Sequence, residues 1–317
     1  MSMRDQFSEF SIDVDFPKAA EDELFASLTE ISAKISRQKF AVSLDDIENI
    51  QTAKHKALEL VERHFTNMQR TALQRRETLS LGLEANFVSI GSDCFPRTVL
   101  TRWGFKKTAK MGEPTLPFDL AIHPLAAVRA LLAEDFKQYF DGSLIIDPVK
   151  GYAVNTELGI ELNHEKDPAF FENGKLELLS RYHRRVSNFK DVMSDTKPAI
   201  CVVHMDEPQI ALLKDVATLI KARREGKETY VVAIYTPRPG LTPAPTALCG
   251  AEDIIIIVEP YPFPKYTWYR QRHTFTLRGV NFEKTVADKL LKIVDDLDIR
   301  RTRHSRTKSS CSSGGVS

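Results

Sequence analysis

A cysteine stands where a short apolar run gives way to a helix-like stretch, in the segment Asn86–Leu100, NFVSIGSDCFPRTVL. The run ends at Gly91, and Pro96 is typical of the first turn of a helix. Cys94 is therefore expected at a strand-to-helix turn. There, backbone N–H groups and the helix dipole stabilise a thiolate, which is the nucleophilic form, and the same N–H groups can hold an oxyanion.

Two other interpretations of this turn remain open. In the first, Ser92 or Asp93 caps the helix and Cys94 only packs. In the second, Asp93 and Cys94 stand where esterases with a Gly-Asp-Ser turn place an aspartate and their serine nucleophile. Those esterases tend to carry an Asp and a His close together near the C-terminus, and His273 has no acid nearby.

A cysteine nucleophile needs a base, commonly a histidine that a third polar group orients. Three of the eight histidines stand at the ends of predicted strands or the starts of predicted helices: His123, His164 and His204. Acidic residues follow His164 and His204 within three positions. Each of the three is either a tuned base or an ordinary polar cap.

The second part of the chain contains four short runs rich in β-branched residues. They are apolar on both faces, which predicts strands covered on both sides. They are residues 86–90, 198–205, 229–236 and 252–260. Helix-like stretches lie between and after them, at residues 96–105, 124–140, 177–193, 207–226 and 282–297. Gly226 stands where the helix of a strand–helix–strand unit should stop. The pattern predicts an α/β domain, a three-layer sandwich with a mainly parallel sheet.

The two ends of the chain have a different composition. Residues 21–35 and 43–65 carry apolar side chains at helical spacing, which predicts an N-terminal helical hairpin. The last residues are rich in Arg, Ser and Gly without apolar periodicity, which predicts disorder. The expected organisation is a helical segment over 1–84, an α/β domain over 85–297 and a disordered basic tail over 298–317.

Composition limits the classes of partner. A formal net charge of +1 over 317 residues gives no basic excess for nucleic acid, and no apolar run is long enough for a transmembrane segment. The acidic start is unlike a secretory signal, and four widely spaced cysteines predict reduced thiols in the cytoplasm, with no disulfide or metal site. Without a P-loop or GxGxxG, no nucleotide cofactor is expected. The aromatic, basic segment 259–275 could wall a pocket for a small-molecule, glycan or peptide substrate.

The order and spacing of several blocks between Phe87 and His204 resemble a bacterial family of unknown function described as papain-like cysteine peptidases. The matching blocks are Gly91 and Cys94; Pro117, Phe118 and Asp119, with Leu120 for the usual Trp; Phe136 and Phe140; His164, with Glu165 for the usual Asp; and Arg184, Arg185 and Phe189. The resemblance implies Cys94 as nucleophile and His164 as base. For the third member, Asp119, Asp167 and Asp206 stay open. Papain-like folds are α+β, and the periodicity decides the expected architecture here.

We therefore expect a thiol-dependent hydrolase or acyltransferase acting on an amide or ester. Cys94 would attack, His164 would take the proton with Asp119 as third member, and backbone N–H groups of residues 92–95 would hold the oxyanion. The expected substrate-binding residues are Ser92, Asp93, Arg97, His204 and Arg184. The alternative is a non-catalytic carbohydrate- or peptide-binding module in which Cys94 is structural and several arginines hold anions: Arg97, Arg184, Arg185, Arg270 and Arg272.

Overall fold

A computed structural model of the chain describes residues 85–140, 144–238, 254–274 and 276–312, together with four isolated residues nearer the N-terminus, Glu48, Gln51, Thr52 and His55. Those four are helical. The rest of the predicted N-terminal hairpin lies outside the described residues. None of the helices within the described ranges is long and apolar enough to cross a bilayer.

Four strands form a parallel sheet, and they coincide with the four apolar runs of the sequence. In sheet order they are β1 (Asn86–Ile90), β5 (Ala199–Met205), β6 (Thr229–Tyr235) and β7 (Ile254–Val258). Every residue of β5 is buried, as expected of a strand that lies inside a sheet with both faces covered. The predicted α/β class with a parallel sheet is confirmed.

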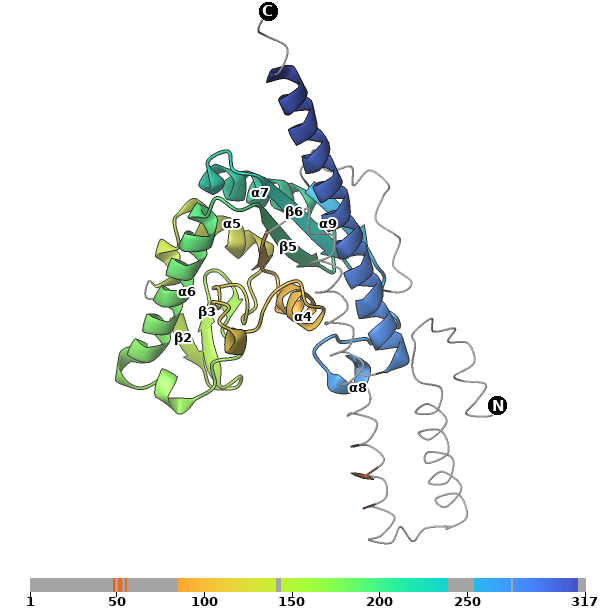
Figure 1. The fold of residues 1–317 in the computed structure, drawn as a ribbon. Coiled ribbons are helices and arrows are strands. Elements are labelled where there is room, and N and C mark those ends of the chain that lie inside the picture. Colours follow the sequence, from red (N-terminus) through yellow and green to blue (C-terminus); the bar gives the residue numbers. More distant parts are fainter. Residues whose placement is uncertain are drawn as a thin grey trace, which may run out of the picture.

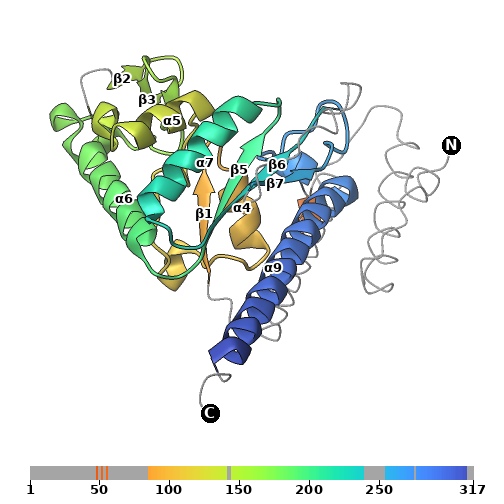
Figure 2. The same cartoon turned by 90° about the horizontal axis from the view of Figure 1, so that it is seen from above.

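Helices lie on both faces of the parallel sheet (Figures 1 and 2). On one face they are α5 (Leu125–Ala133), α6 (Leu176–Ser194) and α7 (Ile210–Arg224), and on the other α4 (Phe95–Arg102) and α9 (Leu277–Ser312). Side chains alternate along β5, so Cys201 and Val203 join the apolar cluster under the first group, and Ile200 and Val202 join the second. The two apolar clusters hold the sheet from both sides.

A second, antiparallel sheet was not predicted. It consists of β2 (Leu144–Asp147), β3 (Tyr152–Asn155) and β4 (Ile160–Glu161). Its strands are only four, four and two residues long, too short for a period-2 pattern to stand out. This small sheet matters for function because the chain leaves β4 directly into the loop that carries His164.

Short helices fill several connections: η1 (Ala109–Met111), η2 (Lys137–Tyr139), η3 (Pro168–Phe170), η4 (Asn173–Lys175) and α8 (Gln271–Thr274). At the C-terminal end, α9 continues to Ser312, whereas the sequence predicted disorder from residue 298. The Arg, Lys, Ser and Thr residues of this stretch are compatible with a helix, and no Gly or Pro interrupts it before Gly314. The low apolar content led to the prediction of disorder, but apolar content does not determine where a helical backbone ends.

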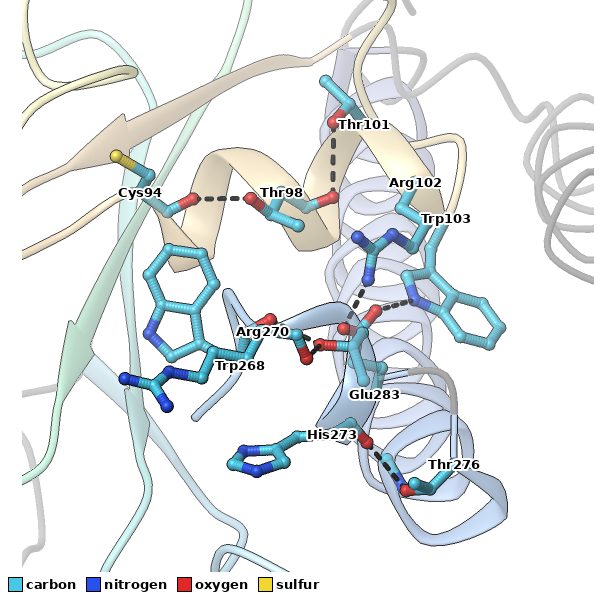
Figure 3. Close-up of polar contacts among 12 residues, drawn as sticks. Cys94, Thr98, Thr101, Arg102, Trp103, Trp268, Arg270, His273, Thr276 and Glu283 are labelled. Carbon is cyan, nitrogen blue, oxygen red and sulfur yellow. Dashed lines mark hydrogen bonds and ion pairs between the residues drawn. The ribbon is translucent and has the colours of Figure 1, made fainter. Parts of the chain in front are cut away.

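The helix that starts at the candidate cysteine is tied to α9 by one buried carboxylate. Arg102 Nη1 lies 2.5 Å from Glu283 Oε1, and Trp103 Nε1 donates to Glu283 Oε2 at 3.3 Å (Figure 3). Burial raises the pKa of Glu283, and the Arg102 guanidinium and the two hydrogen bonds oppose that rise. These contacts fix the C-terminal end of α4 on α9. Cys94 stands at the opposite end of the same helix.

Candidate active site

Cys94 lies between β1 and α4, at the carboxyl end of the parallel sheet, where ligands of open α/β sheets bind. It occupies the N-cap position of α4, and its carbonyl oxygen accepts from the N–H and the hydroxyl of Thr98, each at 3.0 Å (Figure 3). Pro96 stands in the first turn, as the sequence indicated. The strand-to-helix turn predicted around Cys94 is therefore present.

The turn depends on Gly91, the residue after β1. Its φ is +24°, in the region that L side chains rarely adopt. A Cβ atom there would lie 2.5 Å from Val128 Cγ2 and 2.8 Å from the His123 carbonyl oxygen, because α5 and the chain before it pass directly over the turn. Only glycine lets the chain turn sharply enough to start α4 at this place.

Gly91→Ala is expected to lower the free energy of unfolding by about 2–4 kcal/mol, from backbone strain plus overpacking. Urea unfolding followed by circular dichroism measures it. Gly112→Ala is the matched control, since Gly112 also has a positive φ, +88°, but a Cβ there meets nothing within 4 Å. Equal losses in the two variants would show that the close approach of α5 is unimportant.

One short segment, Ala121–His123, is hydrogen-bonded both to the turn before Cys94 and to the strand before His164. The His123 N–H donates to the Ser92 carbonyl oxygen at 2.9 Å, two residues before Cys94. Ile122 exchanges hydrogen bonds of 2.9 and 3.0 Å with the backbone of Glu161, three residues before His164. Backbone pairing on both sides of this segment therefore brings together two loops that are 70 residues apart in sequence.

Cys94 and His164 contact each other, with Sγ 3.4 Å from Nε2. Cys94 is only 5% exposed, whereas His164 is exposed, so the thiol lies beneath the imidazole ring. The thiol also lies 3.8 Å from the Ala121 carbonyl oxygen, a weak acceptor contact. The structure thus places the two residues named by the sequence as nucleophile and base within reach of one proton transfer.

The electrostatics of the pair favour its neutral form. Burial raises the pKa of the Cys94 thiol to about 12, and the carboxylates of Asp93 and Asp119 add to the rise. Partial burial lowers the pKa of His164 below its ordinary value, although the charge of Glu165 opposes this. At neutral pH the pair is therefore a thiol and an uncharged imidazole.

Asp119 does not orient His164. It is fully buried behind Cys94, where it accepts from the Ser89 hydroxyl of β1 and from the Leu116 N–H at 2.8 Å. Two buried cations face it, Arg97 Nη1 at 3.7 Å and Lys106 Nζ at 3.8 Å. Asp119 and Arg97, predicted as catalytic and substrate-binding, therefore form part of an internal ion cluster that holds the loop before Ala121 against the sheet.

The other two aspartates proposed as third member are also placed elsewhere. Asp167 caps η3 by accepting from the Ala169 N–H at 3.0 Å, and Asp206 is exposed after β5. Among the residues that the structure describes, none of Asp119, Asp167 and Asp206 is hydrogen-bonded to His164. The arrangement is therefore a cysteine–histidine dyad in this part of the chain.

Asp93 joins three segments next to the thiol. Its carboxylate accepts from the Phe95 N–H at 3.0 Å, from His204 Nδ1 at 2.9 Å and from Trp268 Nε1 at 3.1 Å. Burial opposes its ionisation, but the charge and hydrogen bond of His204 together with the other two donors hold the pKa of Asp93 below its usual range. This carboxylate fixes the first turn of α4 on the loop after β7.

His204 carries the same network across the sheet. Its Nε2 lies 2.8 Å from the Thr236 hydroxyl after β6 and 3.4 Å from the Tyr261 hydroxyl after β7. The Ser92 hydroxyl donates to the His204 carbonyl oxygen at 3.0 Å. The side chains of Ser92, Asp93 and His204, all predicted to bind substrate, thus have partners within the protein, and together they join the carboxyl ends of the four parallel strands.

The third histidine that the sequence left open, His123, is fully buried. Its Nε2 lies 2.9 Å from the Tyr139 hydroxyl, and burial lowers the pKa of His123 to about 3. An imidazole so easily deprotonated and so enclosed stays neutral and packs in the core. The dyad therefore has a single histidine, His164.

Glu165, the residue after His164, anchors the loop to α6. Glu165 is 2% exposed and pairs with Arg185 Nη2 at 2.6 Å and with Arg181 Nη1 at 2.9 Å. Arg184, predicted to bind substrate, is exposed on the same helix, while its neighbour Arg185 is buried beside the dyad. Buried acid–base contacts such as Glu165–Arg185 are invisible in a single sequence, because the partners lie 20 residues apart on different elements.

One donor of the expected backbone oxyanion hole is used by the protein itself. The Phe95 N–H donates to Asp93, and Pro96 has no N–H to offer. The Asp93 carboxylate also lies at the positive end of the α4 dipole, which it neutralises in part. Within the described residues, the N–H groups of Asp93 and Cys94 have no hydrogen-bond acceptor, so both remain available as oxyanion donors.

Comparisons with protein-family models, with curated proteins and with solved structures find no match to this chain. The resemblance to the papain-like family therefore remains a prediction.

Proposed function

We propose that the protein is a thiol-dependent hydrolase or acyltransferase that acts on an amide or ester, with Cys94 as nucleophile and His164 as general base. The observation that carries the proposal is the 3.4 Å contact between Cys94 Sγ and His164 Nε2. It is supported by the place of Cys94 at the carboxyl end of the sheet and by the free state of its thiol. A free thiol suits the reducing cytoplasm predicted from the sequence.

The reaction starts from the neutral dyad. Cys94 Sγ attacks the acyl carbon while its proton passes to His164 Nε2, and a tetrahedral oxyanion forms. When the oxyanion collapses, the bond from the acyl carbon to the leaving group breaks, and the departing amine or alcohol takes the proton from His164. The thioester left on Cys94 is then attacked by water, or by another acceptor, whose proton His164 removes. The acyl product leaves as an acid or a new ester or amide, and the thiol recovers its proton.

Acylation of Cys94 tests this proposal directly. We expect the full chain mixed with p-nitrophenyl acetate to release a burst of p-nitrophenol and to carry an acetyl group on the Cys94 peptide by mass spectrometry. Iodoacetamide should alkylate Cys94 faster than it alkylates free glutathione near pH 7, because His164 removes the proton during attack.

Cys94→Ala should abolish the burst, whereas Cys201→Ala should leave it unchanged, since the Cys201 thiol is fully buried in β5. If Cys94 is not acetylated and reacts with iodoacetamide no faster than glutathione does, the proposed function is wrong. Cys94 then has the structural role of the alternative, in which the domain binds a carbohydrate or peptide without chemistry.

A further inference from the structure

Two buried polar side chains on α6, Tyr182 and Arg185, lie beside each other. Tyr182 and Arg185 stand three residues apart, on the same face of the helix, with the guanidinium carbon of Arg185 4.5 Å from the centre of the Tyr182 ring. The Tyr182 hydroxyl and Arg185 Nη1 are each shielded from solvent and make no well-aligned hydrogen bond within the described structure. The Tyr182 hydroxyl interacts with Arg185 and with Tyr139, but without good alignment, so the two donors are poorly satisfied and able to bind a further acceptor.

Both groups adjoin the dyad. Arg185 Nη2 is held by Glu165, and the next residue back, His164, contacts Cys94. The charge of Arg185 opposes the rise in the pKa of Cys94 and contributes to the lowering of the pKa of His164. Burial raises the pKa of Tyr182, and the charge of Cys94 acts on it in the same direction. The thiol and the two donors therefore lie near one another, next to the exposed His164.

We propose that Arg185 Nη1 and the Tyr182 hydroxyl donate hydrogen bonds to the carbonyl oxygen of the acyl group that Cys94 attacks, and so stabilise the oxyanion. This inference rests on the proposed function and adds two side-chain donors to the backbone N–H groups at the start of α4. Since Glu165 fixes the guanidinium through Nη2, Nη1 is left as a preset donor. Preset donors in a water-excluded site act strongly on charge that develops during the reaction.

The charge balance favours a neutral carbonyl substrate over a carboxylate at this position. Glu165 already compensates Arg185, and the carboxylates of Asp93 and Asp119 both act on Cys94. A carboxylate substrate would be repelled by these carboxylates already in the ground state. A carbonyl oxygen becomes negative only as the tetrahedral species forms, when the two donors are most effective.

Two reactions of the same thiol separate this role from a structural one. Acylation by p-nitrophenyl acetate passes through an oxyanion, whereas alkylation by iodoacetamide displaces iodide from a saturated carbon and forms none. We expect Arg185→Gln and Tyr182→Phe to lower the rate constant of Cys94 acylation about 100-fold, with the effect in kcat rather than KM. Alkylation should stay within about threefold of the parent rate, since the dyad is intact.

Two further variants are controls. Arg185→Lys keeps the charge next to Glu165 but loses the forked donor, and should cost about tenfold in acylation. Arg181→Gln removes the other cation of Glu165 without touching Nη1, so it should change acylation and alkylation by the same small factor. The inference is overturned if acylation survives in Arg185→Gln and Tyr182→Phe, or if both reactions fall equally. Absence of any acylation of Cys94 in the parent chain would instead defeat the proposed function, and the inference with it.

Discussion

Replacing His164 by Gln should slow acylation of Cys94 about 10²–10⁴-fold near pH 7, the usual contribution of a general base. The reason lies in the thiol, whose pKa is raised to about 12 by burial and by two nearby carboxylates. Without a base, only about 10⁻⁵ of the thiol ionises near pH 7. Stopped-flow release of p-nitrophenol in a single turnover measures the loss.

The pH dependence identifies the base. In the parent protein the rate should rise as His164 loses its proton, at a pH below the ordinary imidazole range because its pKa is lowered, and should then stay flat through neutral pH. In His164→Gln the rate should instead climb about tenfold per pH unit toward the thiol pKa of about 12, so the two curves converge at high pH.

A matched variant and a distinct profile keep this prediction testable. His183→Gln changes an exposed histidine of α6 that stacks on Phe140 at 3.7 Å, and it should leave the rate unchanged. A bell-shaped profile for the parent, with a fall between about pH 7 and 9, would show that the reactive form is a thiolate–imidazolium pair. The neutral dyad would then be the wrong description of the resting site.

The parallel sheet was predictable because its evidence is local. Each of the four strands is a short, mainly apolar run, β5 is buried on both faces, and Gly226 follows the helix between β5 and β6 as expected. The antiparallel sheet was missed because its strands are held by pairing with each other and with Ile122, rather than by an apolar pattern. Hydrogen bonds between segments distant in the chain produce no periodic pattern of apolar residues in the sequence.

The dyad shows the same division between local and non-local evidence. The turn at Cys94 follows from Gly91 and Pro96, and the choice of His164 came from a resemblance in block order. The environment of the pair could not be predicted, because it is made by side chains from distant elements: Asp93 with His204, and Glu165 with Arg185. Burial of the thiol beside the carboxylates of Asp93 and Asp119 changes the expected chemistry from a preformed thiolate at a helix start to a neutral thiol that needs its base.

Arg224→Met is expected to cost about 3–5 kcal/mol of unfolding free energy, because several buried carbonyl oxygens lose a charged donor, at about 1–3 kcal/mol each. Arg224 is fully buried at the end of α7, and its guanidinium donates to carbonyl oxygens at and after the end of α6. Those oxygens belong to Val192, Met193, Asp195 and Lys197. The guanidinium also donates to the Glu228 carbonyl oxygen, just before β6, and Nε reaches the Thr229 hydroxyl.

The last carbonyls of a helix have no partner within it, so this side chain caps α6 from another helix. Arg224→Lys keeps the charge but offers three donors on a single nitrogen, and should lose about half as much stability. The control is Arg129→Met, which breaks an exposed 3.4 Å pair with Asp215 and should cost less than about 1 kcal/mol. Urea unfolding with a common m-value gives the three differences.

A loss of stability in Arg224→Met no greater than in Arg129→Met would mean that water replaces the guanidinium at those carbonyls. The expected larger loss has a consequence for the site, because α6 carries Arg185 and Tyr182 on the turns before the capped end. At urea concentrations well below the unfolding midpoint, Arg224→Met should keep the parent ratio of acylation to alkylation at Cys94. Arg224 affects the stability of the fold, whereas Arg185 and Tyr182 affect the acylation rate. The same set of variants therefore separates the two effects.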